Sequence, residues 1–182
     1  ARYDGPVSGN DSPYAFVVDD SGSIFVTGRI LGIDNSNDIT TVKYNSVGDE
    51  LWNAQYSGIE EEEDGVVAIA NDPFGDVYIA GHTTGVEGIL DLIVLKYSSD
   101  GAEEWVSVYS SPHNYHQWAT ALKVDIHGDL YVSGGGNSGL GREYLTLKYN
   151  SEGENLWEER YRRTENGYDV VKDMIVDYEG NV

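Results

Sequence analysis

Short apolar runs separated by turn residues fill this chain. Between residues 66 and 109 the runs are Val66–Asn71, Val77–Ala80, Leu92–Tyr97 and Glu104–Tyr109, with Gly, Asp, Ser and Pro between them. Short runs rich in Val, Ile, Leu, Tyr and Trp are typical of strands joined by hairpins. No apolar spacing keeps a helical period of about 3.6 residues over ten positions. The pattern therefore predicts a unit of four antiparallel strands.

The same arrangement returns every 52 or 53 residues. One recurring motif contains Tyr, Gly, Trp and Tyr in that order, separated by other residues, and a second contains Asp, Gly and Gly. The first begins at Tyr44, Tyr97 and Tyr149, and the second begins at Asp19, Asp72, Asp125 and, cut short, Asp177. A period of this length means that one supersecondary unit is used repeatedly, each copy burying its faces against its neighbours.

Four strands in about 50 residues describe a propeller blade better than a solenoid coil. We expect an all-β fold, a β-propeller arc of four-stranded antiparallel blades that is incomplete at about 3.4 blades. It forms a single domain over residues 1–182, with repeats at about 4–56, 57–109 and 110–161 and a partial repeat at 162–182. We expect a lone strand before the first complete blade and another after the last. Because each end lies inside a repeat, both ends look like cuts in a longer polypeptide.

The connections within a repeat are of two kinds. Tight turns with Asp first and Gly fourth join the first strand to the second, as in Asp19–Gly22 and Asp125–Gly128. Asp bonds the backbone ahead of it and Gly accepts a positive φ, so these residues are structural. Turns one-to-two and three-to-four lie on one face of the disc, and the longer, variable connections lie on the opposite face. We expect binding on that opposite face.

Two segments of the sequence resemble a known repeat family. The segments Val18–Gly28 and Asp38–Trp52 resemble the bacterial β-propeller repeat called SBBP, and the resemblance covers essentially the whole chain. It implies a seven-bladed propeller in a secreted or surface-attached protein, with no single catalytic activity. The Tyr-Asn-x-x-Gly-x-x-x-Trp piece is also similar to the tryptophan-docking turn of propellers that hold a quinone cofactor.

The net charge of the chain limits the classes of partner that we expect. The chain has 32 acidic and 11 basic residues, for a net charge of −21. Such a field repels nucleic acid and anionic lipid, so neither is expected as a partner. Solubility at an exposed site explains the charge, and divalent cations or a basic partner are the alternatives. The chain has no Cys, which excludes disulfides and thiolate chemistry, and no apolar run is long enough to span a membrane.

Residues that recur in every repeat are expected to be structural. The tryptophans should wedge between blades, the glycines should serve the strand geometry, and the lysines should pair with a carboxylate of the same or the next blade. Aspartates at the start of strand one, with Gln117 in their place in the third copy, should cap the loop backbone or ring the channel, where a cation is the alternative. These sets are Trp52, Trp105 and Trp157; Gly28, Gly81 and Gly134; Lys43, Lys96 and Lys148; and Asp11, Asp64 and Asp169.

Residues that do not recur are better candidates for function, because packing does not require them in every blade. The connection over residues 110–118 holds His113, Tyr115, His116 and Trp118. Aromatic rings with imidazoles suit a sugar ring or a peptide. His113 and His116 at i, i+3 could instead hold a metal, although no third ligand is evident.

Two acidic loops are candidates for calcium. Oxygen ligands alternate in the loop at 34–38, as calcium loops require, and carboxylates follow one another at 60–64. The residues concerned are Asp34, Asp38, Glu61, Glu63 and Asp64. We expect no cofactor, with loosely held calcium as the alternative to a solvated acidic loop.

The composition and the repeat favour a non-catalytic extracellular or cell-surface scaffold for protein or glycan binding or structural assembly. Its partner is a protein, a glycan or the remainder of a longer propeller or assembly. The alternative is a fragment of a propeller enzyme, such as a lyase, a glycosidase or a quinone-dependent dehydrogenase. No Gly-x-Ser-x-Gly, His-x-x-x-His or Walker motif occurs in the sequence, so no catalytic residue is assigned.

Overall fold

The computed structural model describes residues 3–7, 9–33, 36–58, 64–163 and 169–182. They form three four-stranded antiparallel sheets, each with its strands paired in chain order. Blade 1 contains β1 (Ser12–Val18), β2 (Ile24–Leu31), β3 (Asn37–Tyr44) and β4 (Glu50–Tyr56). Blade 2 contains β5 (Gly65–Asn71), β6 (Val77–Thr84), β7 (Leu90–Tyr97) and β8 (Glu103–Tyr109). Blade 3 contains β9 (Gln117–Val124), β10 (Leu130–Ser138), β11 (Gly141–Tyr149) and β12 (Asn155–Tyr161).

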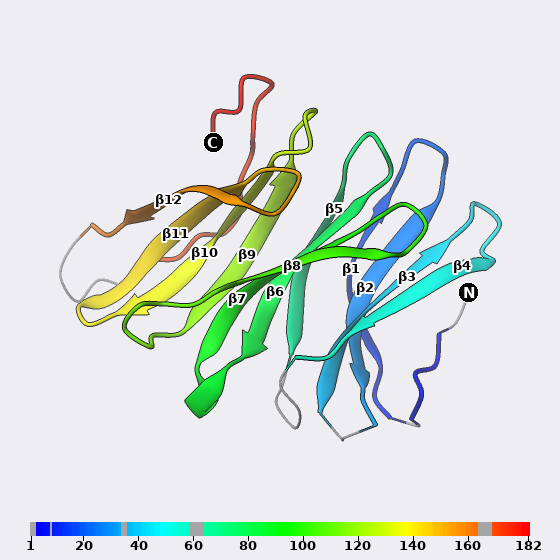
Figure 1. Ribbon diagram of the computed structural model, residues 1–182, viewed down its shortest axis with the longest axis horizontal. Helices are drawn as coiled ribbons and strands as arrows, with labels where there is room; N and C mark the ends of the chain where they lie inside the picture. The colour runs from blue at the N-terminus through cyan, green and yellow to red at the C-terminus, as the bar shows by residue number, and fades with distance from the viewer. Residues whose placement is uncertain (1–2, 8, 34–35, 59–63, 164–168) are drawn as a thin grey trace.

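The three blades stand side by side in chain order (Figure 1). Their first strands are neighbours, since β1 lies against β5 and β5 against β9. The first strands therefore mark the inner side of an arc, and the fourth strands lie at its rim. Among the described residues the single helical element is the short 3₁₀ turn η1 (Val86–Gly88). The expected all-β arc of four-stranded blades is confirmed.

The hydrophobic core lies between the blades. Phe25 and Ile39 of blade 1 pack with Val77, Ile93 and their neighbours in blade 2. A second cluster joins the opposite face of blade 2 to blade 3; its buried members are Tyr78, Ala80, Leu92, Val94, Ala119, Leu122, Leu130, Val132, Leu145, Leu147 and Tyr149. Blade 2 thus buries one face against blade 1 and the other against blade 3, which explains why its strands are apolar on both sides.

Tryptophans join consecutive blades at the rim. The Trp52 indole N–H donates to the Ser99 carbonyl at 3.2 Å, in the turn between β7 and β8 of the next blade. A Cβ atom at Gly101 would lie 2.8 Å from the Trp52 ring, so the ring rests on a bare backbone. Trp105 repeats this contact on blade 3, with its N–H 3.0 Å from the Ser151 carbonyl. We call this contact the tryptophan dock.

The recurring lysines do not all pair alike. Lys96 contacts Asp76 at 3.0 Å and Glu104 at 2.6 Å, and Lys148 contacts Asp129 at 2.7 Å. Burial opposes the charge of Lys96, but these carboxylates outweigh it and raise the pKa of the ammonium group. Lys43 differs from the expectation, because it donates to the Ser99 carbonyl at 3.0 Å and lies 4.7 Å from the centre of the Phe25 ring. Its carboxylate is missing because Ser23 stands where the other blades have Asp76 and Asp129.

The lone strand expected after the last complete blade does not form, since no strand is assigned over residues 169–182. The lone strand expected before the first complete blade falls on the start of the chain, where residues 1 and 2 lie outside the described residues. A strand is defined by backbone hydrogen bonds to a neighbour, and residues 169–182 pair with no strand in the described part of the chain. The segment still makes the turn at Asp177–Gly180, in which the Gly180 N–H donates to the Asp177 carbonyl at 3.0 Å.

Candidate functional site

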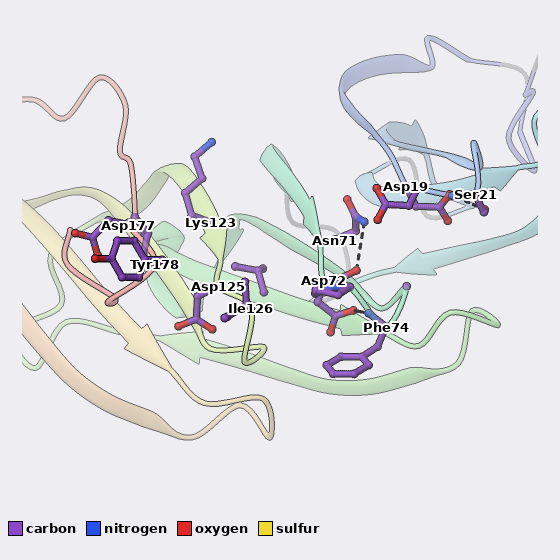
Figure 2. A pocket seen from close by; sticks show the side chains of 15 residues that line it. Asp19, Ser21, Asn71, Asp72, Phe74, Lys123, Asp125, Ile126, Asp177 and Tyr178 are labelled. Carbon is purple, nitrogen blue, oxygen red and sulfur yellow. Dashed lines mark hydrogen bonds between the residues drawn. The ribbon is translucent and has the colours of Figure 1, made fainter.

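A hollow of about 710 Å³ lies at the end of the arc where the tight turns gather. The turns that follow β1, β5 and β9 line it together with the turn at 177–180. Figure 2 shows Asp19, Asp72, Asp125 and Asp177 around this hollow, each from a different repeat. We call it the turn basin.

The four aspartates of the turn basin are committed to their own turns. In each, one carboxylate oxygen accepts two backbone N–H bonds from the residues two and four positions ahead. The second oxygen of Asp72 accepts the Tyr78 hydroxyl at 3.2 Å, and that of Asp125 accepts the Tyr131 hydroxyl at 3.3 Å. The carboxylates hold the turns, as the Asp-to-Gly spacing suggested.

The pKa values of two of these carboxyl groups are lowered by the hydrogen bonds that hold the turns. Burial disfavours the charge of Asp19, but hydrogen bonds from Ser21 and Ser23 outweigh it and lower the pKa of the carboxyl group. Hydrogen bonds from the Asn181 side chain and backbone lower the pKa of Asp177. In the described part of the chain, no three His, Cys, Asp or Glu side chains gather closely enough to hold a metal ion.

The predicted ligand residues lie at the other end of blade 3. His113 and Tyr115 are in the β8–β9 connection, with ring centres 6.3 Å apart. Trp118 is in β9, and its ring covers Gly135 so closely that a Cβ atom there would lie 2.8 Å away. The Arg142 guanidinium lies 5.3 Å from the centre of the Trp118 ring, a cation–π arrangement.

We call His113, Tyr115, His116, Trp118 and Arg142 the loop patch. Tyr115 reaches toward the β10–β11 hairpin that carries Arg142, since a Cβ atom at Gly139 would lie 3.0 Å from its hydroxyl. Sequence reasoning found the first four residues but missed Arg142. The signal was present: four of the six arginines are Arg142, Arg160, Arg162 and Arg163, close together in a strongly acidic chain.

His116 links blade 3 to blade 2 through a hydrogen bond of its side chain. Its Nδ1 accepts the Leu90 N–H at 3.1 Å, at the start of β7 in blade 2, and its carbonyl accepts the Asn137 N–H at 2.9 Å. This bond occupies one ring nitrogen, whereas His113 is exposed and close to Tyr115. The two histidines therefore have different environments, which argues against their use as a matched metal pair.

Two further arginines near the loop patch connect neighbouring strands. Arg160 pairs with Glu143, contacts Glu158 at 3.3 Å and donates to the Tyr109 hydroxyl at 2.7 Å. Arg162 donates to the Ser138 hydroxyl at 3.1 Å. The contacts of Arg160 tie β12 to β11 and to blade 2.

The predicted calcium residues divide into two groups. Asp34, Glu61 and Glu63 lie outside the described residues. Asp38 is buried and accepts a bond from the Gln55 side-chain amide. Asp64 accepts the Gly58 N–H at 2.8 Å and the Thr83 hydroxyl at 2.6 Å.

Aspartates at the start of strand one clip the preceding loop. Asp64 receives an N–H from six residues earlier in the chain, and Asp11 and Asp169 do the same with Gly5 and Arg163, each at 2.9 Å. The loop-capping role, one of the two roles expected for this position, is the one that the hydrogen bonds display.

No protein-family model matches this sequence, and no curated protein matches it. The resemblance to SBBP repeats therefore stays a prediction drawn from the residues quoted above. Within the described residues, the chain has no helix with the length and apolarity needed to cross a membrane.

Proposed function

We propose that this chain is a non-catalytic propeller scaffold, secreted or held at the cell surface, that binds an acidic glycan through the loop patch. One observation carries the proposal: an arginine lies over a tryptophan beside further aromatic and imidazole rings, at the variable-loop end of a chain with net charge −21. The acidic composition and the resemblance to SBBP repeats support the surface location.

The chemistry of the patch favours a sugar with a carboxylate. Aromatic side chains offer flat apolar faces with a polar edge, which suit the faces of a sugar ring. A guanidinium presents a planar fork that matches a carboxylate with two parallel hydrogen bonds. The net charge of −21 repels a highly charged polymer from the whole molecule. The expected ligand therefore carries few carboxylates, and Arg142 offers the local positive charge that meets one of them.

The scaffold explains how such a patch is held. His116 fixes the loop to blade 2, and Gly135 allows the Trp118 ring to lie flat on β10. Binding residues on loops of a rigid sheet framework are held in place without ordering costs at the moment of binding.

Titration calorimetry with an oligosaccharide that carries one uronic acid, and with a neutral oligosaccharide of the same length, tests the proposal. We expect binding of the uronic-acid oligosaccharide alone, weakened about tenfold by Arg142→Gln, which corresponds to about 1.4 kcal/mol. His113→Ala should weaken binding without unfolding the protein, because the side chain is exposed. Lys123→Gln, at the turn basin, is the matched control and should leave the affinity unchanged.

Two results would count against glycan binding at the loop patch. One is equal affinity for the charged and the neutral oligosaccharide, and the other is an equal loss of affinity in Lys123→Gln and Arg142→Gln. Measurements at increasing salt separate a contact at Arg142 from general electrostatic attraction, which salt screens.

A further inference from the structure

Residues 169–176 lie on blade 3 in the place of a first strand. Met174 is buried against Ala121 and Tyr131, with Val176 packed beside them. In the repeat, Met174 takes the position of Leu122, which is buried in the core between blades 2 and 3. The segment thus repeats the contact by which one blade begins on the face of the preceding one.

The turn after this segment copies the turns of the complete blades. The Asp177 N–H donates to the Asn181 carbonyl at 3.0 Å, and Gly180 has φ +80°. A Cβ atom at Gly180 would lie 2.8 Å from the Tyr131 hydroxyl, just as one at Gly128 would lie 3.8 Å from the Tyr78 hydroxyl. A fourth blade is therefore begun and correctly placed.

The edge of that blade is bare. Residues 169–182 join no strand ladder within the described part of the chain. Val182 is 57% exposed, whereas Val77 and Leu130, which hold its position in blades 2 and 3, are fully buried. Ile175 is 81% exposed. An edge with open N–H and C=O groups beside apolar side chains is a template for further strands.

The rim of blade 3 lacks its tryptophan dock. Trp52 and Trp105 each donate to a carbonyl of the following blade. Trp157 contacts Tyr131 of its own blade, with ring centres 6.3 Å apart, and is 36% exposed. Among the described residues, no turn lies beneath its indole ring.

Between the segment and the sheet lies a hollow of about 520 Å³. Ser133, Tyr144 and Thr146 of blade 3 line it together with residues 170–175 and Val182. The Ser133 hydroxyl is buried without a hydrogen-bond partner among the described residues. The equivalent space next to blade 2 is filled by the strands of blade 3.

We propose that this flank of blade 3 binds a three-stranded antiparallel sheet of the same repeat pattern, which completes a fourth blade with residues 169–176 as its first strand. The added second strand pairs with the edge of 169–176. The added third and fourth strands are joined by a turn with Gly in its fourth position, and that turn provides the carbonyl and the bare backbone of a third tryptophan dock. The inference continues an interface that the chain already makes twice, and it is independent of glycan binding.

The test extends the chain by one set of strands. Val182 occupies the position of Val77, so a second copy of residues 78–109 is joined directly after Val182. We expect amide hydrogen exchange of residues 170–176 to slow at least about 100-fold, as expected for amides that enter a ladder in a core sheet. The emission of Trp157, obtained by subtracting the spectrum of a Trp157→Phe variant, should shift to shorter wavelength.

Matched controls use the same extension. In one control, Gly101 of the added copy is replaced by Val. The Val side chain would collide with the Trp157 indole, because even a Cβ atom at Gly101 would lie only 2.8 Å from the docked Trp52 ring. The shift in Trp157 emission should then be lost. In another, the added 32 residues are scrambled.

Trp157→Ala gives a second measurement that does not depend on exchange rates. It should lower the melting temperature far more in the extended chain than in the original chain. The proposal is wrong if residues 170–176 exchange equally fast in the original and extended chains. It is equally wrong if the added strands aggregate or are digested like the scrambled sequence, or if Trp157→Ala has the same effect in both chains.

Discussion

Gly134 lies where β9 and β10 approach so closely that a Cβ atom would stand 2.0 Å from the Trp118 carbonyl oxygen. Gly28 and Gly81 meet the same carbonyl position of their own blades, at 2.4 and 2.0 Å. In each blade the register between the first two strands shifts beside this glycine. The bulge brings the first strand inward, so the glycine is required by the backbone of its neighbour.

Gly134→Ala should therefore destabilise the protein by about 3 kcal/mol, the upper range for forcing an atom into a packed site. Urea unfolding followed by circular dichroism measures the change. Gly139→Ala is the control, since its Cβ would meet only the end of the Tyr115 side chain at 3.0 Å, which can move. Equal losses in the two variants would contradict this explanation of the recurring glycine.

His82 gives the fold a pH dependence. Burial, and secondarily the charge of Arg29, lower the pKa of this imidazole below its usual value. The unfolded chain therefore binds the proton more readily, at a pKa of about 6.5. The stabilisation is complete above that pH and is lost as the pH falls through the lowered folded pKa.

We expect the free energy of unfolding to decrease between about pH 7 and pH 5, and His82→Gln to flatten that part of the profile. Urea titrations at several pH values measure it. His127→Gln, in an exposed turn, is the control and should keep the slope of the original chain. A slope that His82→Gln leaves unchanged would exclude this residue as its source.

Among the structural elements, each fourth strand carries a tryptophan at the same position of the repeat. Trp105 packs on Tyr78, lies over Gly153 and donates to Ser151. We expect Trp105→Ala to cost about 4 kcal/mol, as for other large aromatic truncations. Trp157→Ala should cost about 1 kcal/mol, because a half-exposed ring without a dock loses little buried surface. Equal costs in urea unfolding would show that the dock adds nothing to stability.

The strands could be predicted from the sequence, but their lengths could not. The run Val77–Ala80 marked β6, yet the strand continues to Thr84 because His82 and Thr83 pair through their backbones with Leu92 and Asp91 of β7. Backbone pairing does not require apolar side chains, so a hydrophobic pattern misses it. The segment at 169–182 was wrongly expected to be a strand for the opposite reason: its sequence fits the repeat, but it pairs with no strand among the described residues.

For the candidate site, the sequence indicates the connection that carries the loop patch, but only part of the contacts within the patch. Non-recurring residues at the loop end indicated His113, Tyr115, His116 and Trp118. The contact of Arg142 with Trp118 depends on the register of β10 with β11, which spacing alone does not reveal. A partner in another strand also decides the contacts of Asp11. Its second oxygen has no hydrogen-bond partner among the described residues, because Ile30 replaces the hydroxyl that Thr83 offers to Asp64.

For the molecule as a whole, charge opposes association at the open flanks. Phe16 on blade 1 is 70% exposed, although Leu122 in its position is buried between blades 2 and 3. We expect light scattering to report a monomer near pH 7 at low salt, where the net charge is −21. The mean mass should rise as the pH approaches the isoelectric point of about 4.2.

Phe16→Asp should reduce that association, because it places a charge on the apolar flank. Phe74→Asp is the control, as Phe74 is similarly exposed at the turn basin. If both variants reduce the mass equally, association does not involve the flank.

The tryptophan dock points one way along the chain, from the rim of one blade to the turn of the next. Each junction between blades is therefore the same joint, and none depends on how many blades precede it. Gene duplications or deletions of one whole period would keep every such joint intact, since Trp52 could meet Ser151 and Gly153 in place of Ser99 and Gly101. Over evolutionary time the number of blades can change in single steps, whereas insertions within a period are tolerated only at the loop end.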